Sequence, residues 1–531
     1  MLFLRTGLNV VNKKILRSLS FSVVGVVFVT ALSTMVGCSS LSPEPLNLDE
    51  IQSQAQMEMV NYHNGTEPIN GPLTLEEAIA RALKYNLDHR VKLMEQALAT
   101  GQLEAGRYDM LPKLLTNTGY YGRDSDLTRL SSDSSGNKSS STPFVSSDRR
   151  HSTEDLTFSW GLLDFGTSYY NAKQNSDRML ISLERRRKSM HILIQNVRTT
   201  YWRALAAQTL GNRVSVSIKE AEQALNNSRD ILNSKVRSPG ESLRYQRNLL
   251  ENLRLLEALQ RELSSSRIEL SSLIGASPGT RLELVEPNDA PPTELGMTLE
   301  TMEIQALSHN ADLREAAYNV RISADDTRKA ILKLMPGINL NFSRNHDSDS
   351  YLVDHEWSQA GVNVSFNLFN LLAAPSQKRA AEAGEKVAQS RRMALQMTVL
   401  TQVHLSYHQY DDAVHQYQRA DAIADVDTQL ENIASAQEQS QMGNKLEHIS
   451  ANVIAILSVA RRYQSMAKVQ EAMSHVQATL GMEPEVGSLD EMDLPAIQKT
   501  IKQSLNHWSD QLNNNSQVHM ALEVSKVGEQ K

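Results

Sequence analysis

The sequence predicts a mainly helical protein that carries a small amount of β-sheet and is built from two copies of one unit. Three observations lead to this fold class. A set of matched residues recurs in the two halves of the chain, short segments alternate apolar with small polar residues, and the long segments between them contain no proline. The alternation has the period of a strand, and the proline-free segments are compatible with long helices.

Composition excludes several classes of protein. The 531 residues carry a net charge of -7, so no basic surface for a nucleic-acid partner is indicated. Aromatic residues make up 5% of the chain, which suits long amphipathic helices better than a large compact core. The single cysteine, Cys38, rules out an internal disulfide and a multi-cysteine metal site. We expect no cofactor and no metal.

The N-terminus has the three parts of a secretory signal. Basic residues precede an uncharged segment at 18–36, and small residues close it. The tetrad MVGC, which ends at Cys38, resembles the bacterial lipobox, in which the cysteine becomes the first mature residue and carries the lipid. We expect a signal peptide at 1–37 and lipidation of Cys38, with an uncleaved anchor helix as the alternative. Ser39 follows, and the resemblance then implies the outer membrane.

An internal repeat organises the rest of the chain. Thr74 matches Thr298 and Pro112 matches Pro336, both at an offset of 224 residues (298 − 74 and 336 − 112). The offset then falls to 206 (366 − 160), as shown by the pairs Trp160/Phe366, Tyr201/Tyr407 and Gly275/Gly481. The difference of 18 residues (224 − 206) falls in a serine-rich loop of the first copy, where insertions are tolerated.

Each copy therefore reads helix, strand, loop, strand, long helix, turn and helix. We expect the following segments: signal peptide 1–37, lipidated irregular segment 38–72, repeat one 73–275, linker 276–296, repeat two 297–482, and a polar tail 483–531 with one helix at 494–512.

The first helix of each copy has signals at both ends. Thr74 and Glu77 have the spacing of a capping box, in which a hydroxyl and a carboxylate satisfy free amides at the helix start. Helical periodicity continues from there. We expect one continuous helix that ends before Pro112, and a twin that ends before Pro336.

Strand-like segments follow, although the one after Pro112 alternates poorly and is inferred from its twin. One apolar face and one small polar face is the pattern of a transmembrane barrel with a wet lumen, and a soluble sheet on a core is the alternative. Four strands alone would leave unpaired edges in lipid, so several chains must share a barrel. We expect the lipid-facing residues to be Leu156, Phe158, Trp160, Leu162, Ile338, Leu340, Phe342, Val362, Val364, Phe366 and Leu368.

After each second strand the chain becomes strongly helical. A helix from about Ser168 to Asn233 would be roughly 100 Å long. The returning segments place apolar residues seven apart, which favours coiled-coil packing, although a generic helix core would bury them too. These residues are Leu249, Leu256, Leu263 and Leu270 in the first copy and Val459, Met466, Met473 and Leu480 in the second.

No catalytic motif stands out, so the sequence predicts no enzyme. The densest group of metal-ligand types is HDSDSYLVDHE at 346–356, which lacks calcium-loop spacing. We expect a solvated loop there, with a metal site as the alternative. The run RRRK at 185–188 is expected to be a solvated helix face, with anionic lipid as the alternative partner.

Several short motifs occur in a fixed order. They are the duplicated LTLEEAIARAL start, the LP before a strand, the WGLLDFG strand-to-helix junction, and the LSSLIG and VQATLG helix ends. Over about residues 73–482 this ordered set resembles the TolC-type outer-membrane efflux family, although the second junction, FNLFNLL, lacks the usual Asp-Gly pair. The resemblance implies a homotrimer in which four strands per chain close a twelve-stranded barrel, continued by a periplasmic α-helical coiled-coil tunnel.

The resemblance also implies the partners and the working parts. Family members are passive ducts, joined by a periplasmic adaptor protein to an inner-membrane pump. The turns at the far ends of the hairpins close the tunnel and contact the adaptor, although Glu241 and Glu447 also suit a helix N-terminus. The implied residues are Arg237, Ser238, Pro239, Gly240, Glu241, Met442, Gly443, Asn444, Lys445 and Glu447.

One function and two alternatives follow. The leading hypothesis is a lipid-anchored outer-membrane channel of a tripartite efflux system, which exports small toxic compounds. The first alternative is the outer-membrane duct of a type I protein secretion system. The second is a periplasmic coiled-coil scaffold lipoprotein, which needs no barrel.

Overall fold

The computed structural model describes residues 45–130, 135–136, 142–233, 238–287, 295–442, 445–482, 484 and 492–513. Cys38 and the expected signal peptide lie outside these residues. The chain divides into two units, residues 1–67 and 68–531, and each is described by itself.

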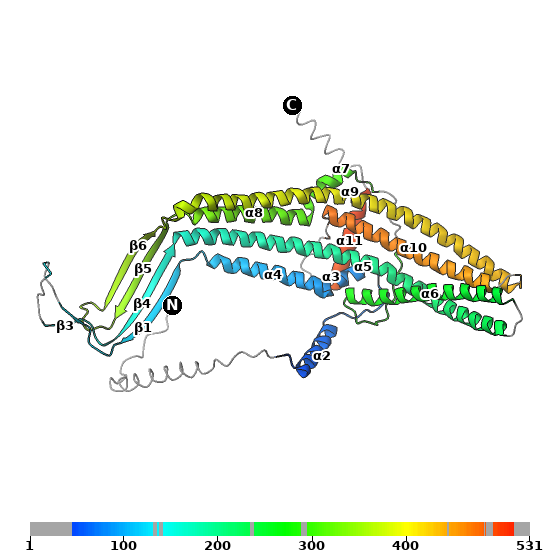
Figure 1. Ribbon diagram of the computed structural model, residues 1–531, viewed down its shortest axis with the longest axis horizontal. Coiled ribbons are helices and arrows are strands. Elements are labelled where there is room, and N and C mark those ends of the chain that lie inside the picture. The colour runs from blue at the N-terminus through cyan, green and yellow to red at the C-terminus, as the bar shows by residue number, and fades with distance from the viewer. Residues whose placement is uncertain are drawn as a thin grey trace, which may run out of the picture. The chain divides into compact units, whose positions relative to one another are not determined.

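In the first unit, residues 48–64 form a helix, α2 (Leu48–Asn64), of 17 residues (Figure 1). The expectation of an irregular segment there is wrong. Its side chains are almost all exposed, so the apolar periodicity that identifies a helix in sequence is weak. The absence of proline and the acidic first turn, with Asp49 and Glu50, favour the helix instead.

A four-stranded antiparallel sheet lies at one end of the second unit (Figure 1). Each repeat contributes two adjacent strands, as the sequence predicts. A small hairpin, β2 (Thr128–Arg129) with β3 (Phe144–Val145), flanks the serine-rich insertion. The order across the main sheet is β1 (Lys113–Gly122), β4 (Arg150–Gly161), β5 (Gly337–Asp347) and β6 (Glu356–Ser365).

Three residues expected in the strands lie outside them. Leu162 is the first residue of α5, and Phe366 and Leu368 follow the end of β6. The alternation of apolar and polar residues continues beyond the strands, but pairing stops where the partner strand ends. Gly337, the first residue of β5, pairs with Ser365, so Phe366 has no partner within the sheet.

Two helices, and not the single one expected, precede the first strand of each repeat. Asn86 and Asn310, a matched pair in the repeat, begin the second helix. Asn86 Oδ1 accepts a hydrogen bond from the His89 amide at 3.0 Å, and Asn310 Oδ1 accepts one from the Leu313 amide at 3.2 Å. An asparagine in this role starts a new helix and ends the old one. The helices are α3 (Leu75–Tyr85) and α4 (Leu87–Tyr108), and α7 (Leu299–His309) and α8 (Ala311–Leu332).

The threonine cap predicted for the first helix is present. Thr74 Oγ1 accepts a hydrogen bond from the Glu77 amide at 3.2 Å, and Thr298 Oγ1 accepts one from the Thr301 amide at 3.3 Å. Both threonines have the extended backbone of an N-cap.

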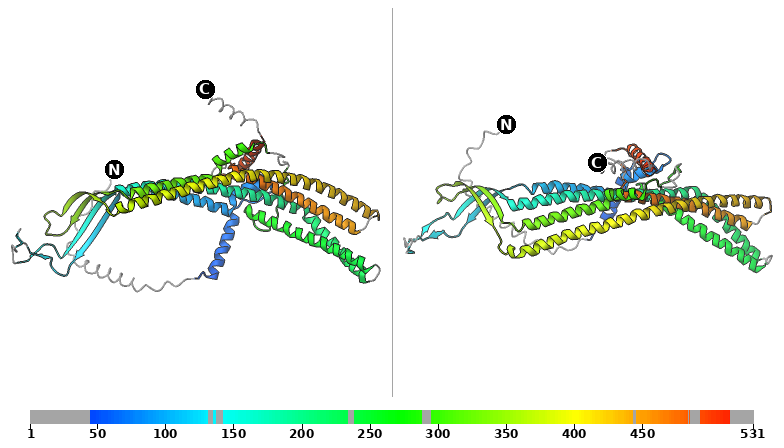
Figure 2. Two further views of the ribbon diagram at one scale, coloured as in Figure 1. Left: turned by 45° about the horizontal axis from the view of Figure 1, so that its top comes forward. Right: turned by 90° about the horizontal axis from the view of Figure 1, so that it is seen from above.

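Each repeat then forms a long helical hairpin that leads away from the sheet. With 72 residues, the first long helix spans about 108 Å and begins earlier than the expected Ser168. The helices of both hairpins extend to the end of the unit opposite the sheet (Figure 2). Among the described residues, no helix combines the length and the apolar content needed to cross a bilayer. The hairpins are α5 (Leu162–Asn233) with α6 (Pro239–Leu273), and α9 (Asn370–Gln439) with α10 (Lys445–Leu480).

The seven-residue apolar repeat is buried in each hairpin. In the first, Leu249, Leu256 and Leu270 are fully buried, and Leu263 is nearly so. In the second, Val459 packs half-buried against a core that buries Met466, Met473 and Leu480. The predicted burial of these residues is confirmed.

The linker and the C-terminal helix pack on the middle of the second unit. Leu73 forms a β-bridge with Leu284, and the Tyr201 hydroxyl lies 2.7 Å from the Leu73 carbonyl oxygen and 2.6 Å from that of Val285. The helix expected in the C-terminal tail is confirmed as α11 (Leu494–Asn513). It packs on α3 and is not simply polar, because it buries Leu494, Ile497, Ile501 and Trp508.

Candidate functional site

The register of the sheet joins the apolar positions of all four strands into one face. Directly opposed residues in neighbouring strands point to the same side of a sheet. The sequence prediction did not include Leu114, because β1 alternates poorly; its repeat partner is Ile338 (338 − 224 = 114). The opposed rows are Leu114–Phe158–Phe342–Ala360, Trp160–Leu340–Val362 and Ile338–Val364, and the next row towards the loops, Thr116–Leu156–Arg344–Ser358, includes the charged Arg344.

This apolar face is exposed. Leu114 is 65% exposed, Phe342 50%, Val362 69% and Val364 62%. A contiguous row of large apolar side chains on a surface marks contact with lipid or with another protein. The eight predicted residues that lie in strands therefore share one face, on which Trp160, Ile338 and Leu340 are half-buried.

The opposite face carries small polar side chains. Asn339, Asn341 and Ser343 alternate along β5. On β1 and β4, Asn117 Nδ2 donates a hydrogen bond to Asp155 Oδ2 at 2.9 Å. The sheet thus has one apolar face and one hydrophilic face, which is the pattern of a barrel wall with a water-filled lumen. Its edge strands, β1 and β6, each pair on one side only within the described part of the sheet.

The HDSDSYLVDHE segment at 346–356 links two loops at the end of the sheet through Asp349. Ser147 Oγ donates a hydrogen bond to Asp349 Oδ2 at 2.6 Å, and the Asp148 amide donates one to Asp349 Oδ1 at 3.0 Å. These hydrogen bonds, led by that of Ser147, lower the pKa of Asp349. Within the described residues, no group of three or more His, Cys, Asp or Glu side chains could hold a metal ion. The carboxylate of Asp349 has a structural use, which is to tie the two loops together.

The starts of α6 and α10, which follow the two hairpin turns, line one cavity at the far end of the unit. Pro239 occupies the first turn of α6, where its missing amide costs nothing, and Glu241 follows it. Lys445 begins α10, and Glu447 lies in its first turn. A cavity of about 500 Å³ is lined by Glu241 from one turn and Lys445 from the other. Met442, which follows α9, has an 81% exposed side chain. Arg237, Gly443 and Asn444 lie outside the described residues.

An ionic seam joins the two repeats, between α5 and α8. Lys188 Nζ lies 2.8 Å from Asp312 Oδ1. Arg185 Nη2 lies 2.7 Å from Glu315 Oε1. Arg321 Nη2 lies 2.7 Å from Asp177 Oδ1. Arg185 and Lys188 are exposed, as expected for a solvated helix face, and they also pair with acids on the other repeat, which the sequence prediction did not include. Three acids in this seam are almost completely buried: Asp177, Glu184 and Asp325.

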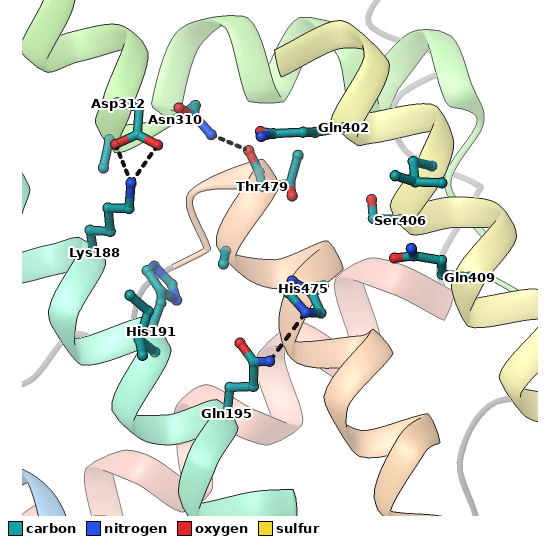
Figure 3. A pocket seen from close by; sticks show the side chains of 14 residues that line it. Lys188, His191, Gln195, Asn310, Asp312, Gln402, Ser406, Gln409, His475 and Thr479 are labelled. Carbon is teal, nitrogen blue, oxygen red and sulfur yellow. Dashed lines mark hydrogen bonds and ion pairs between the residues drawn. The ribbon is translucent and has the colours of Figure 1, made fainter. Parts of the chain in front are cut away.

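A polar cavity of about 430 Å³ lies where α5, α8, α9 and α10 meet (Figure 3). Hydrogen bonds cross it from Gln195 to His475 at 3.1 Å and from Asn310 Nδ2 to the Thr479 carbonyl oxygen at 3.1 Å. Lys188, which also lines it, is paired with Asp312. These contacts join α5, α8 and α10 to one another.

Two histidines of the described residues are buried, His191 on the wall of this cavity and His89 at the start of α4. Burial, with a smaller effect of Arg187 and Arg198, lowers the pKa of His191 to about 4. Burial, with a smaller effect of Arg186, lowers the pKa of His89 to about 4.

These histidines should make the protein acid-sensitive. Their folded pKa lies below the unfolded value, so the unfolded state binds more protons, and stability is lost as the pH falls from about 6.5 towards 4. Between pH 7.5 and 5, each histidine should cost about 2 kcal/mol of unfolding free energy. We expect His89→Leu and His191→Met, which copy the repeat partners Leu313 and Met397, to remove this loss in thermal unfolding. An unchanged acid loss in the double variant would contradict the assignment.

Solved structures of outer-membrane channels share this fold. The Campylobacter jejuni CmeC outer membrane channel matches with a TM-score of 0.59 and 12% identity, over 84% of this chain and 94% of that one. The outer membrane protein VceC from Vibrio cholerae matches with a TM-score of 0.56 and 13% identity, over 77% and 96%. The open state of the Neisseria gonorrhoeae MtrE outer membrane channel matches with a TM-score of 0.54 and 14% identity, over 77% and 88%. Neither a family model nor a curated protein sequence matches this chain.

The chain therefore has the fold of outer-membrane channel proteins of the TolC type. The resemblance that the sequence motifs indicated is confirmed at the level of the fold.

Proposed function

We propose that three copies of this chain form an outer-membrane duct for the export of small toxic compounds. The observation that carries the proposal is the exposed apolar face across a sheet with two edge strands. In lipid such edges must be closed, because an unpaired backbone amide or carbonyl costs several kcal/mol. Three copies of a four-stranded sheet supply a closed twelve-stranded barrel.

The duct needs no chemistry of its own. The small polar side chains of the opposite face would line the lumen, and the long hairpins would continue it into the periplasm as a helical tunnel. Energy would come from an inner-membrane pump, joined through a periplasmic adaptor protein. The names of the similar solved structures, which describe outer-membrane channels, support this role.

The far hairpin turns are the proposed aperture and adaptor contact. Glu241 and Lys445 meet at one cavity there, and Met442 presents an exposed apolar side chain. An exposed methionine at the tip suits an adaptable protein contact. Arg237, Gly443 and Asn444 belong to the same proposed turns.

A lipid on Cys38 is proposed as a second means of holding the protein at the membrane. An acyl chain adds roughly 0.8 kcal/mol per buried methylene. A closed barrel would hold the chain in the bilayer without it, so we assign the lipid to targeting and anchoring and not to transport.

Deletion of the gene tests the proposed cargo. We expect the deletion strain to become more sensitive to a panel of antibiotics, dyes and detergents, with an unchanged set of secreted proteins. Normal resistance together with a missing secreted protein would instead assign the duct to type I secretion. A strain with neither change would favour the periplasmic scaffold.

A further inference from the structure

The polar cavity of about 430 Å³ lies at the junction between the end of α10 and the start of α8 (Figure 3). Asn310 caps α8 through the Leu313 amide, and its Nδ2 donates a hydrogen bond to the carbonyl oxygen of Thr479 near the end of α10. Residues of α5 and α9 supply the remaining walls. One chain therefore builds the whole cavity from both repeats, and its volume lies within the usual range of small-molecule sites, about 300–1,000 Å³.

The charged groups at the cavity wall are paired or neutral. Lys188 Nζ lies 2.8 and 2.9 Å from the two carboxylate oxygens of Asp312, so each charge already has its partner. The imidazole of His191 is neutral at neutral pH, because burial and the nearby Arg187 and Arg198 lower its pKa to about 4. The same two arginines disfavour a cation at this wall. The cavity therefore suits a neutral ligand.

Three side chains of the wall offer hydrogen bonds that no described residue takes up. The His191 side chain is more than nine-tenths buried, and its imidazole makes no hydrogen bond within the described part of the chain. The exposed amides of Gln402 and Gln409, on α9, make none there either. A buried polar group without a partner is costly, so the imidazole favours a partner that enters the cavity. A neutral imidazole and an amide can each donate and accept, which matches the hydroxyl groups of a sugar.

The internal repeat provides a counterpart of this cavity with a different wall. A second cavity, of about 550 Å³, is lined by Arg203 on α5 and Glu269 on α6. These residues correspond to Gln409 and His475 of the first cavity (203 + 206 and 269 + 206). Arg203 Nη1 lies 2.9 Å from Glu269 Oε2, so the counterpart has an ion pair where the first cavity has an amide and an imidazole. The two cavities share a framework and differ in their hydrogen-bonding groups.

We propose that the cavity between α5, α8, α9 and α10 binds a neutral mono- or disaccharide. His191 and the two glutamine amides hydrogen-bond the hydroxyls of the sugar, and Ile192 and Leu405 contact the less polar face of its ring. A bound sugar joins α5 of the first repeat to α9 of the second, so it stabilises the packing between the repeats. The inference goes beyond the proposed duct and does not rest on it, because a single chain supplies the whole wall.

Calorimetry and ligand-observed NMR on the purified full-length protein test the proposal. The detergent must not have a sugar head group, since a maltoside would compete for the cavity. The probes are maltose, whose donors are all hydroxyls, and N,N′-diacetylchitobiose, which also carries acetamido groups. We expect saturable binding of at least one probe below about 10 mM, with a melting temperature that rises with its concentration. Binding of maltose alone assigns the site to plain neutral sugars, and binding of the chitobiose alone assigns it to acetamido sugars.

Two variants and a matched control locate the bound sugar. His191→Met copies the repeat partner Met397, and Gln402→Leu changes an exposed position that folding tolerates. Each should weaken binding about five-fold or more, because each removes hydrogen-bonding groups from the wall. Asn196→Leu changes an exposed amide at the repeat equivalent of Gln402 (402 − 206), in the second cavity, and should leave the affinity unchanged.

Three results would overturn the proposal. The first is the absence of saturable binding for both probes, which would make this a cavity that holds only water. The second is unchanged affinity in both His191→Met and Gln402→Leu. The third is equal weakening by Gln402→Leu and Asn196→Leu, which would place the sugar outside this cavity. None of these results would affect the proposed duct, which depends on the sheet.

Discussion

Replacing Phe342 with lysine is expected to keep the protein out of the outer membrane. Phe342 lies on β5, an inner strand, opposite Phe158 and Ala360 on the exposed apolar face. A lysine on the lipid face of a barrel costs about 2–4 kcal/mol near the midplane, and a trimer would carry three of them. We expect little or no trimer in the outer-membrane fraction after density-gradient separation.

The neighbouring residue provides the matched control. Asn341 lies on the same strand but points to the polar face, opposite Ser159 and Gly361. Asn341→Lys should assemble in nearly normal amounts, because a lysine facing water costs little. Equal assembly of the two variants would show that the apolar face does not meet lipid, and the barrel would have to be abandoned.

Arg321→Ala should produce the largest loss of stability in the helical part. Arg321 Nη2 lies 2.7 Å from Asp177 Oδ1, and the carboxylate is completely buried while the arginine is half exposed. Burial already raises the pKa of Asp177, and Arg321 opposes that change. Without the arginine the buried carboxylate loses its direct ion-pair partner and keeps only the weaker effect of Lys173, and breaking a buried pair in this way costs about 3–5 kcal/mol. Chemical unfolding of the purified protein measures the loss.

Two comparisons separate this effect from a general effect of removing an arginine. Asp177→Asn in the Arg321→Ala background should recover much of the loss, because the buried charge is gone. Arg185→Ala, which breaks the more exposed pair with Glu315, should cost at most about 1 kcal/mol. The Arg321→Ala defect should also shrink as the pH is lowered, since protonation neutralises Asp177. Equal losses for the two arginine variants would contradict the buried-charge explanation.

The sequence was sufficient for the architecture because the repeat doubles every signal. The weak alternation around Leu114 was interpretable only through its partner Ile338, and the structure confirms a strand there. The break between the two helices at Asn86 cannot be recognised from periodicity, because the apolar periodicity of α3 continues into α4 without interruption. The repeat indicates this helix break, because Asn310 occupies the matched position and caps a helix in the same way.

The ionic seam could not be predicted from local sequence. A run of charges such as the one beginning at Arg185 resembles a solvated helix face, and its acidic partners lie more than a hundred residues away. Only the packing of α5 on α8 brings Arg185 to Glu315 and Lys188 to Asp312. By contrast, the hairpin turns were located correctly in sequence, because Pro239 interrupts the helical pattern of the first repeat.

Labelling of single cysteines in intact cells tests most directly whether the sheet crosses the outer membrane. Val353, 97% exposed, lies in the loop between β5 and β6, and Met442, 81% exposed, lies at the hairpin turn at the opposite end of the helices. With a membrane-impermeant maleimide, Val353→Cys should react in intact cells, and Met442→Cys should react only after the outer membrane is permeabilised. If Val353→Cys also needs permeabilisation, both ends of the molecule are periplasmic and the protein is not a duct.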